Sequence, residues 1–277
     1  MSNLQTRVIT ALVLAALVIG TLVTGSSVLW AGLVLAFCIA AVWEGQRLCG
    51  QTSTSSSALG WISAIAVLGS LWVMVFWLTG PAGPVFFTLL LAVSLFWLVV
   101  APVQLGRHWL PPSAIATRLI LLLLIAAAWL SAVLLQRLGV KYLLAVVVLT
   151  VVADVAGYFV GRAFGRRKLA PSISPGKTRE GAVGGVTAAA LWSVMAALHL
   201  NLAATPAQLA VATVAGAALG CCAVMGDLWE SLLKRQAGVK DSSQLLPGHG
   251  GVLDRIDAQL AVLPTATLLI SLVKPLW

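Results

Sequence analysis

Long apolar runs recur from one end of the chain to the other. An α-helix rises 1.5 Å per residue, so about 20 apolar residues cross a hydrocarbon core of roughly 30 Å. Nine runs approach this length, near residues 7–24, 27–43, 59–79, 84–101, 118–135, 142–161, 182–200, 207–228 and 256–273. The pattern predicts an all-α, polytopic integral membrane protein with about nine transmembrane helices in a single membrane domain over 1–277.

Composition supports the membrane assignment. Of 277 residues, 60% are apolar and only 9% are charged, whereas a soluble domain carries about a quarter charged residues. The net charge of +9 comes from scattered basic residues. These values exclude a soluble enzyme, a disordered chain and a nucleic-acid-binding domain, so no nucleic-acid partner is expected. The four cysteines lack zinc-type spacing and give no disulfide signal.

Basic residues fall on one side of the predicted spans. The first run lacks a small-residue cleavage site, so we interpret it as a retained span. With the N-terminus in the cytoplasm, 14 of the 17 Lys and Arg residues are cytoplasmic, and only Arg137, Lys141 and Lys274 lie outside. This positive-inside bias predicts that the chemistry of the protein faces the cytoplasm.

The first polar segment runs from Asp154 to Gly181. Asp154, Gly157, Tyr158 and Gly161 share one helix face at spacings of three and four residues. The small residues favour close approach of another helix, and the carboxylate is a functional candidate because an acid at that depth is costly in lipid. The alternative is a buried Asp154 that only hydrogen-bonds a neighbouring helix.

Gly176-Lys177-Thr178 resembles part of a phosphate-binding loop. The chain does not match the full motif, because that motif needs a preceding strand and a glycine at the position where this chain has Pro171. The loop over 172–181 still offers hydroxyls, basic side chains and backbone amides ahead of a helix, which suit an anionic phosphate. For Arg166, Arg167 and Lys168 an ordinary positive-inside loop is the better interpretation.

The second polar segment runs from Gly226 to Asp257. Asp227, Ser231 and Lys234 form one stripe of a helix, and Glu230 can pair with Lys234. A glycine-rich loop containing His249 follows. Asp254 and Asp257 then open the last run, where capping explains one acid but not two.

Carboxylates, lysines and glycine-rich loops at a membrane surface suit phosphate chemistry. Mg²⁺ takes few protein carboxylates and completes its shell with water and substrate phosphates. Phosphoryl and nucleotidyl transfer need charge neutralisation more than a covalent nucleophile. The residues alone therefore indicate a metal-dependent transferase or hydrolase acting on phosphates.

The run from Ser231 to Asp257 closely resembles the signature of the phosphatidate cytidylyltransferases. It reads Ser231-x-Leu233-Lys234-Arg235, four residues, Lys240-Asp241-x-Ser243, two residues, Leu246-Pro247-x-His249-Gly250-Gly251-Val252-x-Asp254-Arg255-Ile256-Asp257. About seventeen positions are specified, with no departure. The resemblance extends over about residues 140–265, which divides the chain into N-terminal spans over 1–139 and a catalytic half over 140–277.

The resemblance implies transfer of CMP from CTP to phosphatidic acid, giving CDP-diacylglycerol and pyrophosphate in phospholipid biosynthesis. It implies Mg²⁺, a second cation such as K⁺, a homodimer, and an inner (plasma) membrane location with the active site facing the cytoplasm. The metal carboxylates are expected to be Asp227 and Asp254. The full catalytic set is expected to be Asp227, Asp254, Lys240, Lys234 and Asp257. The substrate-binding set is expected to be Ser174, Lys177, Thr178, Arg235, His249, Arg255 and Asp154.

Four other functions are compatible with part of the pattern. A CTP-dependent polyprenol kinase or an archaeal-type lipid cytidylyltransferase would use the same nucleotide. An ion-coupled transporter would place Asp154 and Asp227 on an ion path, but it predicts acids near mid-membrane and inverted repeats. A non-catalytic membrane scaffold would leave the clustered acids and basic loops unexplained.

Overall fold

The protein is almost entirely helical. The computed structural model describes residues 3–50, 83–111 and 113–274, and a few positions between 62 and 76. The helices are α1 (Asn3–Val23), α2 (Ser27–Leu48), α4 (Gly83–Leu95), the π-helical turn η1 (Phe96–Val100), α5 (Ala101–Arg107), α6 (Ala114–Leu138), α7 (Val140–Phe164), α8 (Arg179–His199), α9 (Pro206–Gln236) and α10 (Leu253–Ser271). Two short strands, β1 (Lys168–Ala170) and β2 (Ser174–Thr178), separate α7 from α8.

Seven helices among the described residues are long and apolar enough to cross a membrane, counting 83–107 as one. The all-α membrane architecture is therefore confirmed, whereas the number nine is not. The predicted run at 59–79 and the polar stretch at 51–57 lie largely or wholly outside the described residues. The last predicted run coincides with α10, but this helix carries Asp254, Arg255 and Asp257 near its start.

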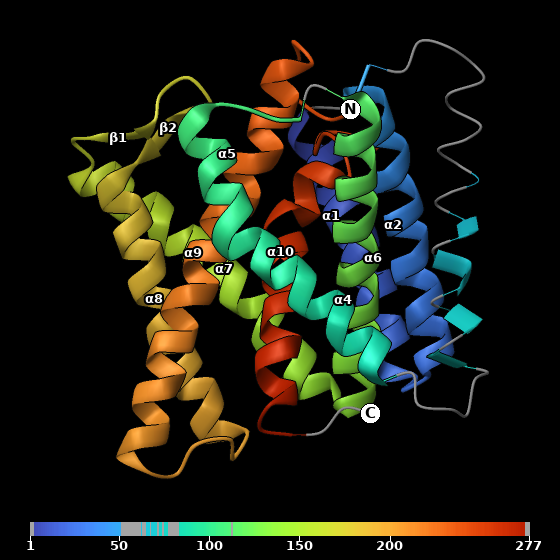
Figure 1. Ribbon diagram of the computed structural model, residues 1–277, viewed down its shortest axis with the longest axis vertical. Helices are drawn as coiled ribbons and strands as arrows, with labels where there is room; N and C mark the ends of the chain where they lie inside the picture. Colours follow the sequence, from blue (N-terminus) through green and yellow to red (C-terminus); the bar gives the residue numbers. More distant parts are fainter. Residues whose placement is uncertain are drawn as a thin grey trace.

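Helix α10 occupies the centre of the bundle (Figure 1), where it packs against α4, α6, α7 and α9. Its residues Leu260, Ala261 and Val262 are buried, and the Leu260 carbonyl accepts a hydrogen bond from Trp97 Nε1 at 3.0 Å. A Cβ atom at Gly226 would lie 2.5 Å from the Asp257 carbonyl oxygen, so this glycine permits the close contact of α9 with α10. The N-terminal spans and the C-terminal half thus share one core.

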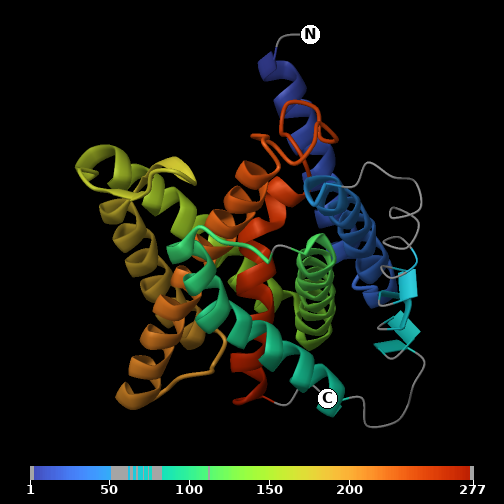
Figure 2. The same cartoon turned by 45° about the horizontal axis from the view of Figure 1, so that its top comes forward.

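The polar segments gather at one end of the bundle, together with the N-terminus (Figure 2). Thr10 of α1 donates a hydrogen bond to the Pro247 carbonyl at 3.0 Å, and Ser172 lies 3.1 Å from His108 Nδ1. The C-terminus lies at the opposite end, where Lys274 Nζ donates to the Tyr142 hydroxyl at the start of α7. The two polar segments therefore share one side of the bundle.

A β-hairpin forms where the sequence predicts only a loop. Lys168 pairs with Thr178 and Ala170 with Ser174 in antiparallel register, and Lys168 Nζ donates to the Pro175 carbonyl at 2.8 Å. The loop interpretation is wrong for these residues because β1 has only three residues and β2 contains a proline and a glycine, so neither strand shows a strand pattern in the sequence. Thr178 then caps α8 by accepting a hydrogen bond from the Gly181 amide.

The sidedness of the bundle can be tested by single-cysteine labelling after the four native cysteines are replaced. We expect Ser172→Cys and Gln244→Cys, both exposed at the polar end, to resist an impermeant thiol reagent in intact cells and to react in inverted vesicles. Asn201→Cys, exposed in the connection between α8 and α9, is the matched control with the reverse behaviour. Labelling of Ser172→Cys in intact cells would contradict a cytoplasmic polar end.

Candidate functional site

A cavity of about 460 Å³ opens between α7, α8 and α9 near the polar end of the bundle. Its charged lining residues include Asp154 of α7, Lys177 of β2 and Asp227 of α9. Thr178 and several glycines complete much of the wall. The cavity thus brings together residues from both polar segments of the sequence.

Glycines set the shape of this cavity. A Cβ atom at Gly157 would lie 3.3 Å from the Gly181 carbonyl oxygen, and one at Gly161 would lie 3.0 Å from Thr178 Oγ1. A Cβ atom at Gly181 would approach the Gly157 carbonyl oxygen to 2.7 Å. The small-residue face predicted for α7 is therefore confirmed as the surface on which α8 packs.

Acidic and basic side chains both line the cavity: Asp154 and Asp227, with Arg162 and Lys177. Lys177 Nζ forms an ion pair with Asp227 Oδ2 at 2.6 Å, and Ser231 donates to the other Asp227 oxygen at 3.3 Å. Asp154 and Asp257 interact electrostatically with both Asp227 and Lys177. Asp227 thus has two further carboxylates and one lysine within electrostatic range, and a bound cation would relieve the repulsion among the carboxylates.

The donor chemistry around Asp227 suits Mg²⁺ rather than a metal enclosed by protein. Among the residues that the structure describes, no three His, Cys, Asp or Glu side chains converge closely enough to hold a metal ion. Mg²⁺ is normally held by one or two carboxylates and completes its octahedron with water and phosphate oxygens. Asp227, with Asp257 close by, fits that pattern.

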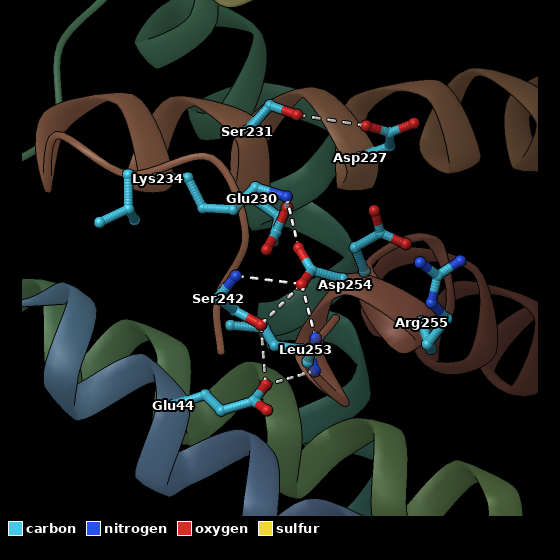
Figure 3. A network of polar contacts seen from close by, with 12 residues as sticks. Glu44, Asp227, Glu230, Ser231, Lys234, Ser242, Leu253, Asp254 and Arg255 are labelled. Carbon is cyan, nitrogen blue, oxygen red and sulfur yellow. Dashed lines mark hydrogen bonds and ion pairs between the residues drawn. The ribbon is translucent and has the colours of Figure 1, made fainter. Parts of the chain in front are cut away.

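Asp254 lies in a second polar cluster on the neighbouring face of α9 (Figure 3). Its Oδ1 accepts from Lys234 Nζ at 2.6 Å, and its Oδ2 accepts from the amides of Ser242 and Gly251 at 3.0 and 2.9 Å. Burial opposes ionisation, but these hydrogen bonds and the Lys234 charge hold the pKa of Asp254 below its usual range. Asp254 is therefore ionised and firmly held.

Lys234 joins two acids in this cluster. It forms an ion pair with Glu230 one turn earlier on α9, as the sequence predicts, and a second with Asp254. The Glu230 and Asp254 side chains are only 2% and 7% exposed. Lys234 thereby compensates charges that would be costly to bury unpaired.

Glu44 of α2 belongs to the same cluster, and the sequence analysis missed it. It is fully buried, and Oε1 accepts from Ser243 Oγ at 2.6 Å and from the Val252 amide at 2.9 Å. Oε2 accepts from Ser242 Oγ at 2.9 Å and from the Leu253 amide at 2.7 Å. The sequence did contain a signal for Glu44. It directly follows the apolar run over 27–43, and an acid at such a position is a functional candidate.

The predicted metal carboxylates have different partners. Asp227 contacts Lys177 and Ser231, whereas Asp254 contacts Lys234, Ser242 and Gly251. Both are oriented by α9 and α10, which pack together. Their use of one common metal ion stays a prediction.

Two predicted substrate-binding arginines contact backbone carbonyls. Arg235 donates to the carbonyls of Ile173 in the hairpin and Val239 in the following loop. Arg255 donates twice to the His249 carbonyl, at 2.9 and 2.6 Å. In this arrangement Arg235 joins the end of α9 to the hairpin, and Arg255 joins the start of α10 to the loop before it.

The remaining predicted residues occupy distinct places. Lys240 lines a separate cavity of about 530 Å³ with Arg47 and Asp241. Ser174 pairs with Ala170 at the start of β2 and is not among the residues that line the first cavity. His249 Nδ1 is buried and has no hydrogen-bond partner within the described part of the chain.

Comparison with known proteins identifies the family. The model of the cytidylyltransferase family matches residues 5–273. The chain belongs to the cytidylyltransferase family. A phosphatidate cytidylyltransferase of Pseudomonas aeruginosa is 37% identical over 274 residues, with 94% of each chain covered. One from Brucella suis is 37% identical over 277 residues, covering 94% of this chain and 91% of its own.

The family match includes the N-terminal spans. A phosphatidate cytidylyltransferase of Haemophilus influenzae is 48% identical over 127 residues, 46% of this chain and 44% of its own. The family model nevertheless covers nearly the whole chain, so the resemblance is wider than residues 140–265. Helix α2, which carries Glu44, lies inside the matched region.

Gly251 offers a direct test of the second cluster. A Cβ atom there would lie 1.9 Å from Ser242 Oγ and 2.6 Å from Glu44 Oε1. We expect Gly251→Ala to destabilise the protein by about 1–3 kcal/mol, the usual range for an overpacked interior, and to lower its thermal midpoint in detergent. Gly32→Ala in α2 is the control, since nothing lies within 4 Å of the added Cβ. Equal midpoints for the two variants would contradict the packing of this cluster.

Proposed function

We propose that the protein is a phosphatidate cytidylyltransferase that makes CDP-diacylglycerol and pyrophosphate from CTP and phosphatidic acid. A phosphate oxygen of phosphatidic acid forms a new bond to the α-phosphorus of CTP. The bond from that phosphorus to the oxygen bridging the α- and β-phosphates breaks, and the electron pair leaves with pyrophosphate. The cavity with Lys177 and Asp227 carries the proposal, together with the family and the names of its relatives.

Lys177 is proposed to bind a substrate phosphate. Its ammonium group reaches into the cavity, and its Asp227 partner side chain is 33% exposed, so a phosphate oxygen can approach the pair. Thr178 and Asp154 line the same cavity. A fixed cation at this position would stabilise the negative charge that develops in the transition state.

Mg²⁺ is proposed as the cofactor, with Asp227 and Asp254 as its expected protein ligands. When bound, the ion would neutralise the phosphates of CTP. Asp257 lies close enough to Asp227 to interact with it electrostatically, and a bound ion would relieve the repulsion between the two carboxyl groups. A second cation such as K⁺ and a homodimer complete the proposal from the family resemblance.

Lys240, Lys234, Arg235, His249, Arg255 and Ser174 are proposed to serve the reaction around this centre. Lys234 would hold Asp254 in place through their contact at 2.6 Å. Arg235 and Arg255 would act through the backbone carbonyls that they bind. Lys240, in the neighbouring cavity with Arg47, would contribute positive charge toward the nucleotide phosphates.

The location of the polar cavity fits a lipid substrate. The chain is a multi-pass membrane protein, and its polar cavity lies at the end of the bundle that carries most basic residues. We propose that this end faces the cytoplasm at the inner membrane. Phosphatidic acid would then present its phosphate at the interface that CTP reaches from the cytosol.

The activity is tested with purified protein in mixed micelles with phosphatidic acid, each of the four nucleoside triphosphates, and with or without Mg²⁺. We expect transfer with CTP, dependent on Mg²⁺, with the α-phosphate label in the lipid and the γ-phosphate label in pyrophosphate. A γ-phosphate label in the lipid would instead indicate a lipid kinase. An archaeal-type ether lipid phosphate, added as a second acceptor, distinguishes the related cytidylyltransferase reaction.

The metal assignment is tested by replacing each carboxylate with the isosteric amide. Asp227→Asn and Asp254→Asn should each lower Mg²⁺-dependent turnover by orders of magnitude, because charge that stabilises the transition state is lost. The double variant should be hardly worse than either single variant, since residues that serve one metal act as a unit. Substantial Mg²⁺-dependent activity in both single variants would contradict the assignment and direct attention to Asp154 and Asp257.

A further inference from the structure

Glu44 lies outside the catalytic half, on α2, yet its contacts are with the signature loop. Its donors are the hydroxyls of Ser242 and Ser243 and the amides of Val252 and Leu253. Ser242 and Ser243 lie in the middle of the loop over 237–252 that joins α9 to α10, and Val252 and Leu253 lie where this signature loop ends and α10 begins. One side chain thus ties the middle of the loop to the start of α10.

The amides bound by Glu44 include the first donors of α10. The first amides of a helix have no partner within the helix and carry its positive dipole end. Val252 stands at the N-cap of α10 and provides no side-chain cap. The Glu44 carboxylate supplies this function from another helix, more than 200 positions away in the chain.

Ser242 connects Glu44 to Asp254. Its hydroxyl lies 2.9 Å from Glu44 Oε2 and 3.0 Å from Asp254 Oδ2, and it can donate its single proton to one of them at a time. Asp254 in turn binds Lys234. The chain of contacts runs from α2 through the loop to the two ionised residues on α9 and α10 (Figure 3).

Burying the Glu44 carboxylate in order to hold the signature loop is energetically unfavourable. Glu44 is fully buried, and its four donors are two neutral hydroxyls and two amides. Removing a carboxylate from water is unfavourable, and here hydrogen bonds and the dipole of α10 offset that penalty. A neutral glutamine side chain would be less unfavourable to bury. Its amide nitrogen, however, would face a backbone amide, so that two donors would meet without an acceptor.

We infer that Glu44 is a positioning residue for the reaction, because its carboxylate ties the middle of the signature loop to the start of α10 and thereby sets the places of Asp254 and Lys234. This inference rests on the proposed function for its kinetic consequence. Its structural consequence, a loop held by the Glu44 charge, does not depend on the substrate.

Hydrogen exchange tests the structural consequence without any substrate. Glu44→Gln should speed amide exchange in the segment 242–254, because the Val252 and Leu253 amides lose a charged acceptor. Gln104→Leu is the matched control: Gln104 is buried and accepts a hydrogen bond from Trp229 Nε1 at 2.7 Å, also linking the N-terminal spans to α9. It should leave exchange in 242–254 unchanged.

Kinetics tests the positioning role on folded, monodisperse protein. Misplacing reacting groups by about 1 Å can cost about a hundredfold in rate, so Glu44→Gln should lower kcat roughly ten- to a hundredfold with KM for phosphatidic acid near the wild-type value. Glu44→Asp keeps the charge on a shorter side chain and should recover part of the loss. Gln104→Leu should retain kcat per folded molecule.

Glu44 and Ser242, which are in contact, should also affect kcat as one unit. The effects of Glu44→Gln and Ser242→Ala on kcat should be far from additive when combined, because each breaks the same link to Asp254.

Unchanged exchange in 242–254, or a kcat within twofold of wild type for Glu44→Gln, would overturn the inference. An activity loss in Glu44→Gln that Gln104→Leu shares per folded molecule would also overturn it. Absence of CTP-dependent transfer in the wild-type protein would tell against the proposed function instead, while the exchange experiment would still decide whether Glu44 holds the loop.

Discussion

The structure depends on satisfying the polar start of α10 inside an apolar bundle. Backbone amides away from water need partners, and a membrane protein must find them within itself. Here the amides of Gly251, Val252 and Leu253 bind the carboxylates of Asp254 and Glu44. Because α10 packs against α4, α6, α7 and α9, the placement of its first turn affects the whole core.

Helix α9 serves two sites because of its pitch. Residues four apart lie on one face, so Ser231 supports Asp227 at the cavity, whereas Glu230 and Lys234 lie together on another face, where Lys234 binds Asp254. The two pairs are offset around the helix axis by a fraction of a turn. One helix can thus hold a partly exposed ion pair at the cavity and a buried ion pair beside the start of α10.

Much of the architecture was predictable because lipid imposes strong constraints on sequence. Apolar runs gave the positions of most described helices, and basic residues predicted that both polar segments share one end. The glycine face of α7 and the Glu230–Lys234 pair also follow from helical spacing, and the structure confirms both. The hairpin over 168–178 gave no such pattern, since its register depends on pairing between strands rather than on local preference.

By itself the sequence determined the membrane fold, the family signature and which residues can carry charge at one end of the bundle. These follow from local composition and spacing, which a linear chain displays directly. Only the tertiary structure decided how the charges are partnered: Asp227 with Lys177, Asp254 with Lys234, and Glu44 with the loop before α10. Partner choice depends on which helices pack together, and Glu44 reaches across about 200 residues of sequence to donors that no local pattern relates to it.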